Sequence, residues 1–409
     1  MERSNLALEK EKDIMNPRRL FNRDFLLLWV GQAASAFGDA VHYIAMAWWI
    51  MQTFNSPIVL GNTYALLSAP RVLIGPIAGA VVDRSNRKWI IVGMDLIRGL
   101  VITSMAIMAI NDKLTKPYLY LFSVIISLSG AFFTPAVNAS IPLLVHKKHL
   151  TRANSLYSIS RPLFNLLGPG IGGLLIAKWG APIVFLINGI TFFASGVTEM
   201  FIRIPKRNGL KHSYIGFLKS IKEGFTYIFE KKQLRAMVLG LSFASFFIGP
   251  IDILLPKYVQ SDLSLSAAHY GLVVSIFSLG FIASSGILAL IPNVKRPATF
   301  ITIGIFSMGI LLIMTTWQQS FYYLMGTIFC VGTAFAIVNI LINVQIQTTV
   351  PDNMRGRVFS LLETFIGTLT PVSLAMGGYF LNVLTSRQFM ILMGLGVAIG
   401  GFVYLKSRG

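Results

Sequence analysis

The sequence has little cysteine and little charge. Cys330 is its single cysteine, which excludes an intramolecular disulfide and leaves the redox compartment undetermined. Only 12% of the 409 residues are charged, whereas 54% are hydrophobic. Soluble proteins carry about 25% charged residues, and predominantly apolar runs of about 20 residues are typical of membrane helices. Such runs recur along this chain, so the composition predicts an integral membrane protein.

Motifs of enzymatic chemistry are missing as well. There is no Walker phosphate loop, no set of histidines and cysteines with metal-ligand spacing, and no nucleophile elbow. We therefore expect a protein that is not an enzyme and that holds no cofactor and no metal. Two other classes stay open, a membrane enzyme and a membrane receptor that transports nothing. Either would need a clustered catalytic or ligand-binding site.

Twelve predominantly apolar segments are long enough to cross a bilayer as helices. They span residues 25–50, 57–82, 89–110, 118–145, 153–177, 182–203, 234–258, 267–291, 298–317, 320–346, 357–384 and 387–405. Of the lysines and arginines that connect or flank these segments, 27 lie on the side that holds both termini and 5 lie on the other. Since cytoplasmic loops are rich in lysine and arginine, this bias predicts cytoplasmic termini.

The basic excess bears on the partners of the protein. A formal net charge of +19 would favour nucleic acid in a soluble protein. Here its one-sided distribution is an orientation signal, so we expect contact with membrane lipids and no nucleic-acid partner. The charged residues before Asp24 contain no apolar core with a cleavage site, so we expect the first span to direct membrane insertion.

The chain divides near its middle. We expect a cytoplasmic tail over 1–24, six helices over 25–203, a cytoplasmic linker over 204–233, six helices over 234–405 and a tail over 406–409. The linker is basic with apolar residues at helical spacing, which predicts an amphipathic helix along the membrane surface. The halves are similar at an offset of 205 residues, at which Asn138, Arg152, Gly172 and Gly173 correspond to Asn343, Arg357, Gly377 and Gly378.

A dense group of charges separates the second and third spans. Together with two glycines that share a helix face before it, the group comprises Gly75, Gly79, Asp83, Arg84, Arg87 and Lys88. Charges at this density cannot lie in lipid, so they mark a tight loop. The glycines allow a neighbouring helix to approach closely, and Asp83 can pair with arginines or cap a neighbouring helix.

This loop resembles the signature loop between helices 2 and 3 of the major facilitator superfamily. Asn86 stands where the family usually has a glycine, and asparagine tolerates the same left-handed backbone. The resemblance implies an all-α membrane protein with twelve transmembrane helices in two pseudo-symmetric six-helix bundles and a small-molecule substrate site between them. Without an ATP site, transport would use an ion gradient, and we expect a monomer.

A second motif lies in the fifth span. The residues that fit the Gly-Pro-x-x-Gly-Gly core of the superfamily's antiporter motif are Gly168, Pro169, Gly172 and Gly173, while Phe164 replaces a preceding glycine. This motif is associated with exporters. Its small residues allow close packing, and Pro169 removes a backbone hydrogen bond and favours a bend. Simple helix packing is the alternative, because glycine and proline are common in membrane helices.

Other motifs resemble the branch of the superfamily that contains macrolide efflux proteins and the enterobactin exporter. They are Phe37-Gly38-Asp39, the loop Val82 to Lys88, Asp95-x-x-Arg98, Pro135-Ala136, Ile141 to Val145, and Ala153 to Leu156. This resemblance implies efflux of an amphiphilic small molecule, a drug or a siderophore, across the bacterial cytoplasmic (inner) membrane by proton antiport. A lysophospholipid flippase or an importer of the same fold stays open.

Ionisable residues within the spans are candidates for proton coupling, because each is unfavourable in hydrocarbon. Asp39 lies near mid-membrane, His42 follows on its helix face, and Arg71 lies at similar depth in the second span. Burial favours a neutral carboxyl group whereas a nearby arginine favours the carboxylate, so such a site can exchange protons. A permanent Asp39–Arg71 ion pair without a transport role is the alternative, and Asp252 is a second candidate.

Another group of charges lies in the cytoplasmic third of its spans, level with the signature loop: Asp95, Arg98, Arg161 and Glu363. Asp95 and Arg98 can pair on one helix face. We interpret the group as gate and interhelical pairs that hold an outward-facing state. Breaking it should then shift the equilibrium between two states rather than abolish substrate binding.

Aromatic and amide side chains within the spans are candidates for contact with a large amphiphilic substrate. Those that we predict in the cavity are Tyr43, Phe132, Asn138, Asn165, Phe246 and Asn343. The alternative for each is ordinary, since aromatic residues often face lipid or neighbouring helices, and amides in membrane helices commonly hydrogen-bond between helices.

Overall fold

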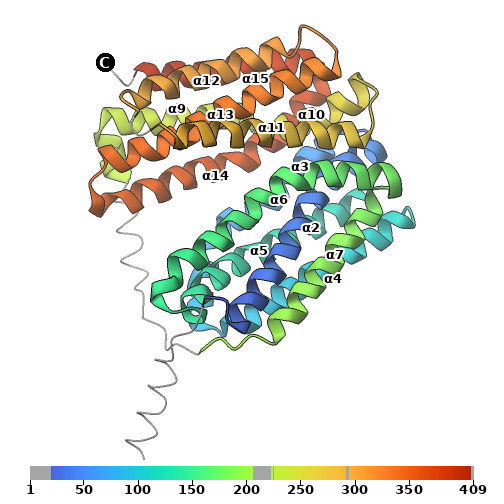
Figure 1. Ribbon diagram of the computed structural model, residues 1–409. Helices are drawn as coiled ribbons and strands as arrows, with labels where there is room; N and C mark the ends of the chain where they lie inside the picture. The colour runs from blue at the N-terminus through green and yellow to red at the C-terminus, as the bar shows by residue number, and fades with distance from the viewer. Residues whose placement is uncertain (1–19, 206–222, 224, 292–293, 407–409) are drawn as a thin grey trace, which may run out of the picture.

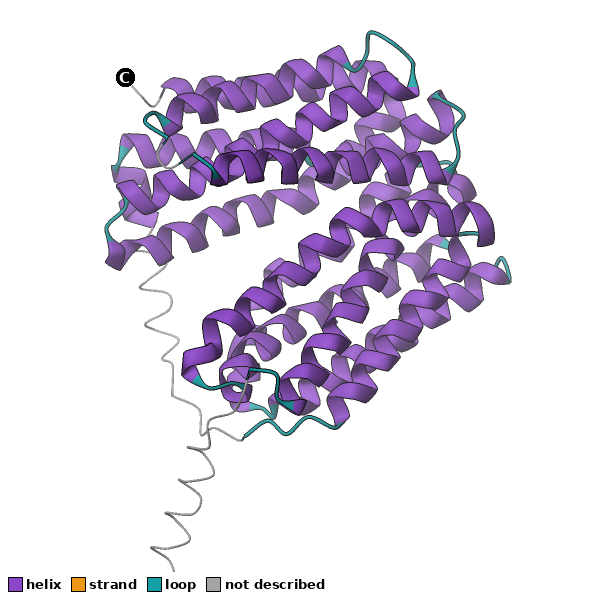
Figure 2. Ribbon diagram, in the orientation of Figure 1, coloured by secondary structure: helices purple, strands orange, loops and turns teal. Residues whose placement is uncertain are grey.

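The computed structural model describes residues 20–205, 223, 225–291 and 294–406, and within these residues the chain is built from helices and short connections (Figure 2). Most of the predicted linker helix over 204–233, most of the N-terminal tail and the last three residues lie outside the described part of the chain. The all-α fold class expected from the sequence is confirmed.

Within the described residues, twelve helical segments follow one another up and down. The first six are α2 (Arg23–Phe54), α3 (Pro57–Arg84), α4 (Arg87–Ile110), α5 (Lys116–Leu144), α6 (Leu150–Trp179) and α7 (Ala181–Met200). The next are α9 (Lys232–Ile248) with α10 (Ile251–Lys257), α11 (Ala267–Ala289), α12 (Pro297–Met314), α13 (Phe321–Thr349), α14 (Asp352–Val383) and α15 (Ser386–Leu405). Each segment begins and ends within five residues of a predicted span.

Eleven of these segments are long and apolar enough to cross a membrane. The exception is α2, although its 32 residues are ample for a crossing. Its lower hydropathy has a cause in the sequence, because Gln32, Asp39 and His42 lie along it. Since α2 packs against both α6 and α7, these polar side chains lie within the bundle and are shielded from lipid.

Capping residues set the turn between α2 and α3. Asn55 ends α2 in the left-handed region, with φ of 43°, a conformation that asparagine tolerates better than most residues. Ser56 then caps α3 by accepting a hydrogen bond from a backbone N–H, and Pro57 is the first helical residue, where its missing N–H does no harm.

Two local expectations are wrong. Asn86 has a φ of −75° rather than a left-handed backbone, because its side chain caps α4 by accepting a hydrogen bond from the Lys88 N–H at 3.2 Å. The seventh span is not one continuous helix, since Pro250 cannot donate to the Phe246 carbonyl and α9 ends before it. The freed Phe246 carbonyl instead accepts a hydrogen bond from the Ser373 hydroxyl of α14.

The two halves repeat one helix arrangement. Residues 116–144 of α5 and 321–349 of α13 differ by 205 at both bounds, and so do residues 181–200 of α7 and 386–405 of α15. The contacts between the halves repeat as well, because α3 packs against α14 while α6 packs against α11. Helices α2 to α7 form one bundle and α9 to α15 form the other (Figure 1).

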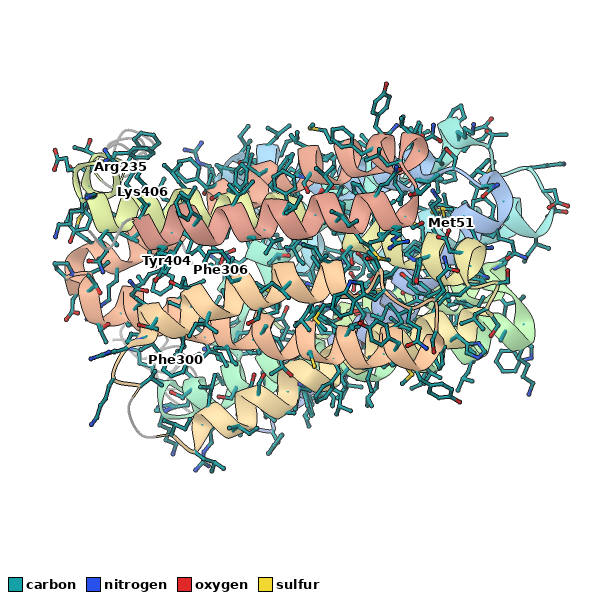
Figure 3. All side chains as sticks on the ribbon, turned by 90° about the horizontal axis from the view of Figure 1, so that it is seen from above. Met51, Arg235, Phe300, Phe306, Tyr404 and Lys406 are labelled. Atoms are coloured by element: carbon teal, nitrogen blue, oxygen red, sulfur yellow. The ribbon has the colours of Figure 1, made fainter. Side chains whose placement is uncertain are left out.

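The bundles meet at one end of the molecule and diverge at the other (Figure 1). We call the end that holds Arg235 and Lys406 the linker end, and the opposite end, which holds Met51, the far end (Figure 3). At the far end the glycines of the two halves touch, since a Cβ on Gly61 would lie 3.1 Å from the Gly378 Cα. Close backbone approach of this kind is the ordinary way in which membrane helices pack.

Candidate substrate cavity

A cavity of about 520 Å³ lies inside the first bundle. Helices α2 to α6 supply its walls, and six of the residues predicted from the sequence line it: Asp39, Arg71, Arg98, Asn138, Arg161 and Asn165. A volume of this size suits a small-molecule ligand. The structure therefore brings together residues from the predicted coupling, gate and cavity groups, which the sequence had treated as three separate sets.

Arginines dominate the charge of this cavity. Arg71 donates from Nη2 to the Thr134 hydroxyl at 3.1 Å, and Arg161 makes no hydrogen bond or ion pair with any residue that the structure describes. Asp39 likewise has no ion-pair partner within 4.0 Å among these residues. This conformation therefore does not contain the Asp39–Arg71 ion pair that the sequence left as an alternative.

Arg98 is the third arginine, and it is held firmly. Its Nη2 lies 2.7 Å from Asp95 Oδ1, the pairing that the spacing on α4 allows. The guanidinium also lies over the rings of Phe133 and Phe192, at 4.0 and 4.7 Å from their centroids. Cation–π contacts and a buried ion pair together fix the arginine in the cavity wall.

Sequence reasoning missed Glu199, which lies behind this wall in the last turns of α7. Its side chain is 1% exposed, and its Oε1 accepts a hydrogen bond from Gln32 Nε2 at 2.9 Å. A signal existed, because Glu199 is the single acidic residue of its predicted span and a carboxyl group within a membrane helix is a functional candidate. Trp29 and Tyr157 also line the cavity without having been predicted.

His42, Tyr43 and Asp252 lie away from this cavity. His42 packs against Phe185 of α7, with ring centroids 4.8 Å apart, and it is not among the lining residues. Its helix face is turned toward α7 because α2 is wedged between α6 and α7. Tyr43 stacks on Tyr64 at 4.8 Å, and Asp252 of α10 faces Tyr43 across the junction of the two halves, so this pair lies in the far-end contact.

The second bundle has its own smaller cavity of about 240 Å³, which Asn343 and Glu363 both line. Phe246 instead borders a narrow cleft against α14 and α15. Phe132 lines neither cavity, whereas its neighbour Phe133 lines the larger one. Consecutive helical residues point about 100° apart, so predicting the wrong member of such a pair reflects an unknown helix rotation.

Among the described residues, no hydrogen bond or ion pair joins the signature loop to the second bundle. Asp83 pairs with Arg87 at 3.4 Å within its own loop, and its side chain is 50% exposed. Arg87 also donates to the Ala139 carbonyl of α5. A Cβ added to Gly75 or Gly79 would meet no described atom within 4 Å, so no described helix packs on these two glycines.

The glycine motif of α6 holds two interfaces. Gly168 and Gly172 pack on α2, against Ala40 and Val41. Gly173 faces α11, where a Cβ would lie 2.6 Å from the Ala267 carbonyl oxygen. Two hydrogen bonds extend this contact toward mid-helix, from Ser275 and Ser278 of α11 to backbone carbonyls of α6. The motif therefore closes the far end between the halves.

These observations define a class of protein. Two six-helix bundles meet at the far end and part at the linker end, the first bundle holds an arginine-lined cavity, and eleven apolar helices among the described residues make the chain a multi-pass membrane protein. Residues 28–373 match the Major Facilitator Superfamily. The chain belongs to this family, so it is a transporter and not an enzyme.

Known proteins agree with this assignment. The chain is 26% identical to macrolide efflux protein A of Streptococcus pyogenes, over 90% of this chain and 92% of the relative. It is 23% identical to the multidrug efflux pump Tap of Mycolicibacterium fortuitum, over 92% and 94% of the two chains. The nucleoside transporter NupG shares the fold with a TM-score of 0.75 at 12% identity, over 94% of this chain and 98% of that one.

Proposed function

We propose that this protein exports an amphiphilic small molecule across the bacterial cytoplasmic membrane by alternating access, with proton antiport through Asp39. The observation that carries the proposal is the position of Asp39, which lies in one cavity with Arg71 and Arg161 and has no ion-pair partner among the described residues. The similarity to macrolide efflux protein A and to the multidrug efflux pump Tap supports transport out of the cell.

The orientation follows from the 27 to 5 distribution of lysine and arginine. In this orientation the linker end is cytoplasmic, and the parted bundles correspond to an inward-open state. A substrate then enters the cavity from the cytoplasm or the inner leaflet. The far-end contacts at Gly173 and Gly378 keep it from the outside until the bundles rock to the opposite state.

The signature loop acts as a gate in the opposite state. Gly75 and Gly79 face open space in this conformation, and α3 already packs on α14 at the far end. Rocking of the bundles brings the rest of α3 onto α14, where the two glycines permit close approach. Asp83 and the cluster of Asp95, Arg98, Arg161 and Glu363 then stabilise that closure.

Proton coupling rests on competition for the arginines. Asp39 in its charged form attracts Arg71 and Arg161, whereas the neutral carboxylic acid releases them. The two protonation states of Asp39 therefore favour different arrangements of α2, α3 and α6, which differ in how well they accept a substrate. A proton taken up from outside accompanies release of the substrate there.

The test uses purified protein in liposomes with an imposed pH gradient, with a macrolide, a catecholate siderophore and a lysophospholipid offered separately. We expect uphill accumulation of the macrolide or the siderophore. Asp39→Asn should still bind that substrate in detergent but lose gradient-driven accumulation, while Asp252→Asn should keep it. Uphill transport by Asp39→Asn that still collapses with the pH gradient would place the coupling carboxylate elsewhere. Transport of the lysophospholipid alone would establish the flippase instead.

A further inference from the structure

Two acidic side chains are buried side by side behind the cavity wall. Asp95 of α4 is fully buried and Glu199 of α7 is 1% exposed, and their carboxyl groups lie within hydrogen-bonding reach of each other. The helices are close here, because a Cβ on Gly196 would lie 3.6 Å from Asp95 Cβ. Two carboxylates at this separation in a low-dielectric interior repel each other strongly.

The hydrogen bonds account for one oxygen of each acid. Asp95 Oδ1 pairs with Arg98, and Glu199 Oε1 accepts from Gln32 at 2.9 Å and from the Ser195 hydroxyl at 3.4 Å. The other two oxygens, Asp95 Oδ2 and Glu199 Oε2, are buried and have no donor among the described residues. Since the two carboxyl groups lie within hydrogen-bonding reach of each other, one proton shared by these two oxygens would give both a partner. Two carboxylate oxygens are both acceptors, so they need a proton between them.

The local charges do not balance without that proton. Two carboxylates share one arginine, which leaves an excess negative charge in a dry site, and such a charge is very unfavourable. The other titratable groups that face the pair are Asp39 of α2 and Tyr157 of α6, and neither brings positive charge. Arg161 and Arg71 interact with Asp39 in the cavity itself.

We propose that Asp95 and Glu199 form a second proton-binding site, in which one proton lies between Asp95 Oδ2 and Glu199 Oε2 and Arg98 compensates the remaining charge. With the proton in place the cluster is neutral and every buried oxygen has a partner. Without it, Arg98 faces two carboxylates and is drawn from the rings of Phe133 and Phe192. Since Arg98 is part of the cavity wall, the wall changes with the proton.

The site is separate from the one assigned to Asp39, and its existence does not depend on the proposed export. Asp39 lines the open cavity, whereas the pair is buried between α2, α4 and α7 and connects to the cavity through Arg98 and Gln32. Glu199 is therefore a positioning residue for Arg98. Its protonation can respond to the pH at the linker end whatever the substrate is.

Infrared spectroscopy of the purified protein in lipid tests the proposal directly. A protonated carboxyl group has a carbonyl stretch that a carboxylate lacks, and it shifts in heavy water. We expect the wild type at neutral pH to lose the intensity of one such group in Glu199→Gln, and likewise in Asp95→Asn, because the remaining acid then ionises beside Arg98. Asp39→Asn is the matched control and should keep this band. A band that persists in both Glu199→Gln and Asp95→Asn overturns the proposal.

A second test of the proposal is thermal unfolding measured as a function of pH. In the wild type, alkaline pH removes the shared proton and leaves adjacent carboxylates, so the melting temperature should fall as the pH rises. In Glu199→Gln the side-chain amide donates a permanent hydrogen bond to Asp95, so this variant should keep its melting temperature over the same pH range. Equal alkaline losses in the two proteins would contradict the shared proton. So would displacement of the wild-type band by sodium, with potassium as the control, because the site would then bind a metal cation.

Discussion

Gly173→Ala should drive the protein out of the conformation seen here. The added Cβ would lie 2.6 Å from the Ala267 carbonyl oxygen and 3.1 Å from the Gly271 Cα. Both obstacles are backbone atoms, so no change of rotamer relieves the overlap and α6 must move away from α11. Overpacking of this kind costs about 1–3 kcal/mol. Because the contact exists only where the halves meet at the far end, the overlap destabilises this state alone.

The expected population shift follows from this energy. A difference of 1–3 kcal/mol corresponds to a change of roughly 5- to 150-fold in a two-state equilibrium. The intrinsic preference of a helix for alanine over glycine is roughly 0.5–1 kcal/mol and stabilises both states alike. Gly93→Ala is the matched control, since a Cβ on Gly93 of α4 would meet no described atom within 4 Å.

Distances between spin labels at the linker end report the two states. Asn154 of α6 and Thr348 of α13 are exposed there, one on each bundle, and the background variant Cys330→Ser removes the native thiol. Because the bundles diverge at this end, we expect a long distance between the labels in this conformation. We expect Gly173→Ala to lose the long-distance population in favour of a shorter one, and Gly93→Ala to keep it. A distribution in Gly173→Ala that matches both the wild type and this control would refute the steric argument.

Three further outcomes are expected. Gly79→Val should leave the present state intact, because a Cβ at Gly79 would meet no described atom within 4 Å. It should suppress the state that is closed at the linker end, and the same spin labels measure this under conditions that favour the outward-facing state. Asp83→Asn should change the free energy of unfolding by less than about 0.5 kcal/mol, since the ion pair of Asp83 is exposed. The same variant should lose most transport in liposomes. Full transport would show that the loop only sets the topology. In the Cys330→Ser background, a cysteine at Lys113 should react with an impermeant thiol reagent in intact cells and one at Arg84 should not, and the opposite labelling would reverse the orientation.

Among the described residues, the sequence alone determined the number and type of the membrane spans and their bounds to within five residues. Apolar length specifies a membrane helix without help from the rest of the fold, because each backbone group must be satisfied within its own segment. The offset of 205 residues between the halves could also be found in the sequence, since Asn138 and Asn343 occupy corresponding positions of α5 and α13. The loop of charges after Gly79 was sufficient to indicate the family, which the profile match then established.

The tertiary structure decided which side chains meet. Hydropathy around a membrane helix is nearly uniform, because lipid and neighbouring helices are both apolar, so the sequence does not fix the rotation of each helix. Packing on α7 therefore buried His42 against Phe185, outside the cavity that Asp39 lines. The same packing buried Glu199 against Asp95, from helices more than 100 residues apart in the chain.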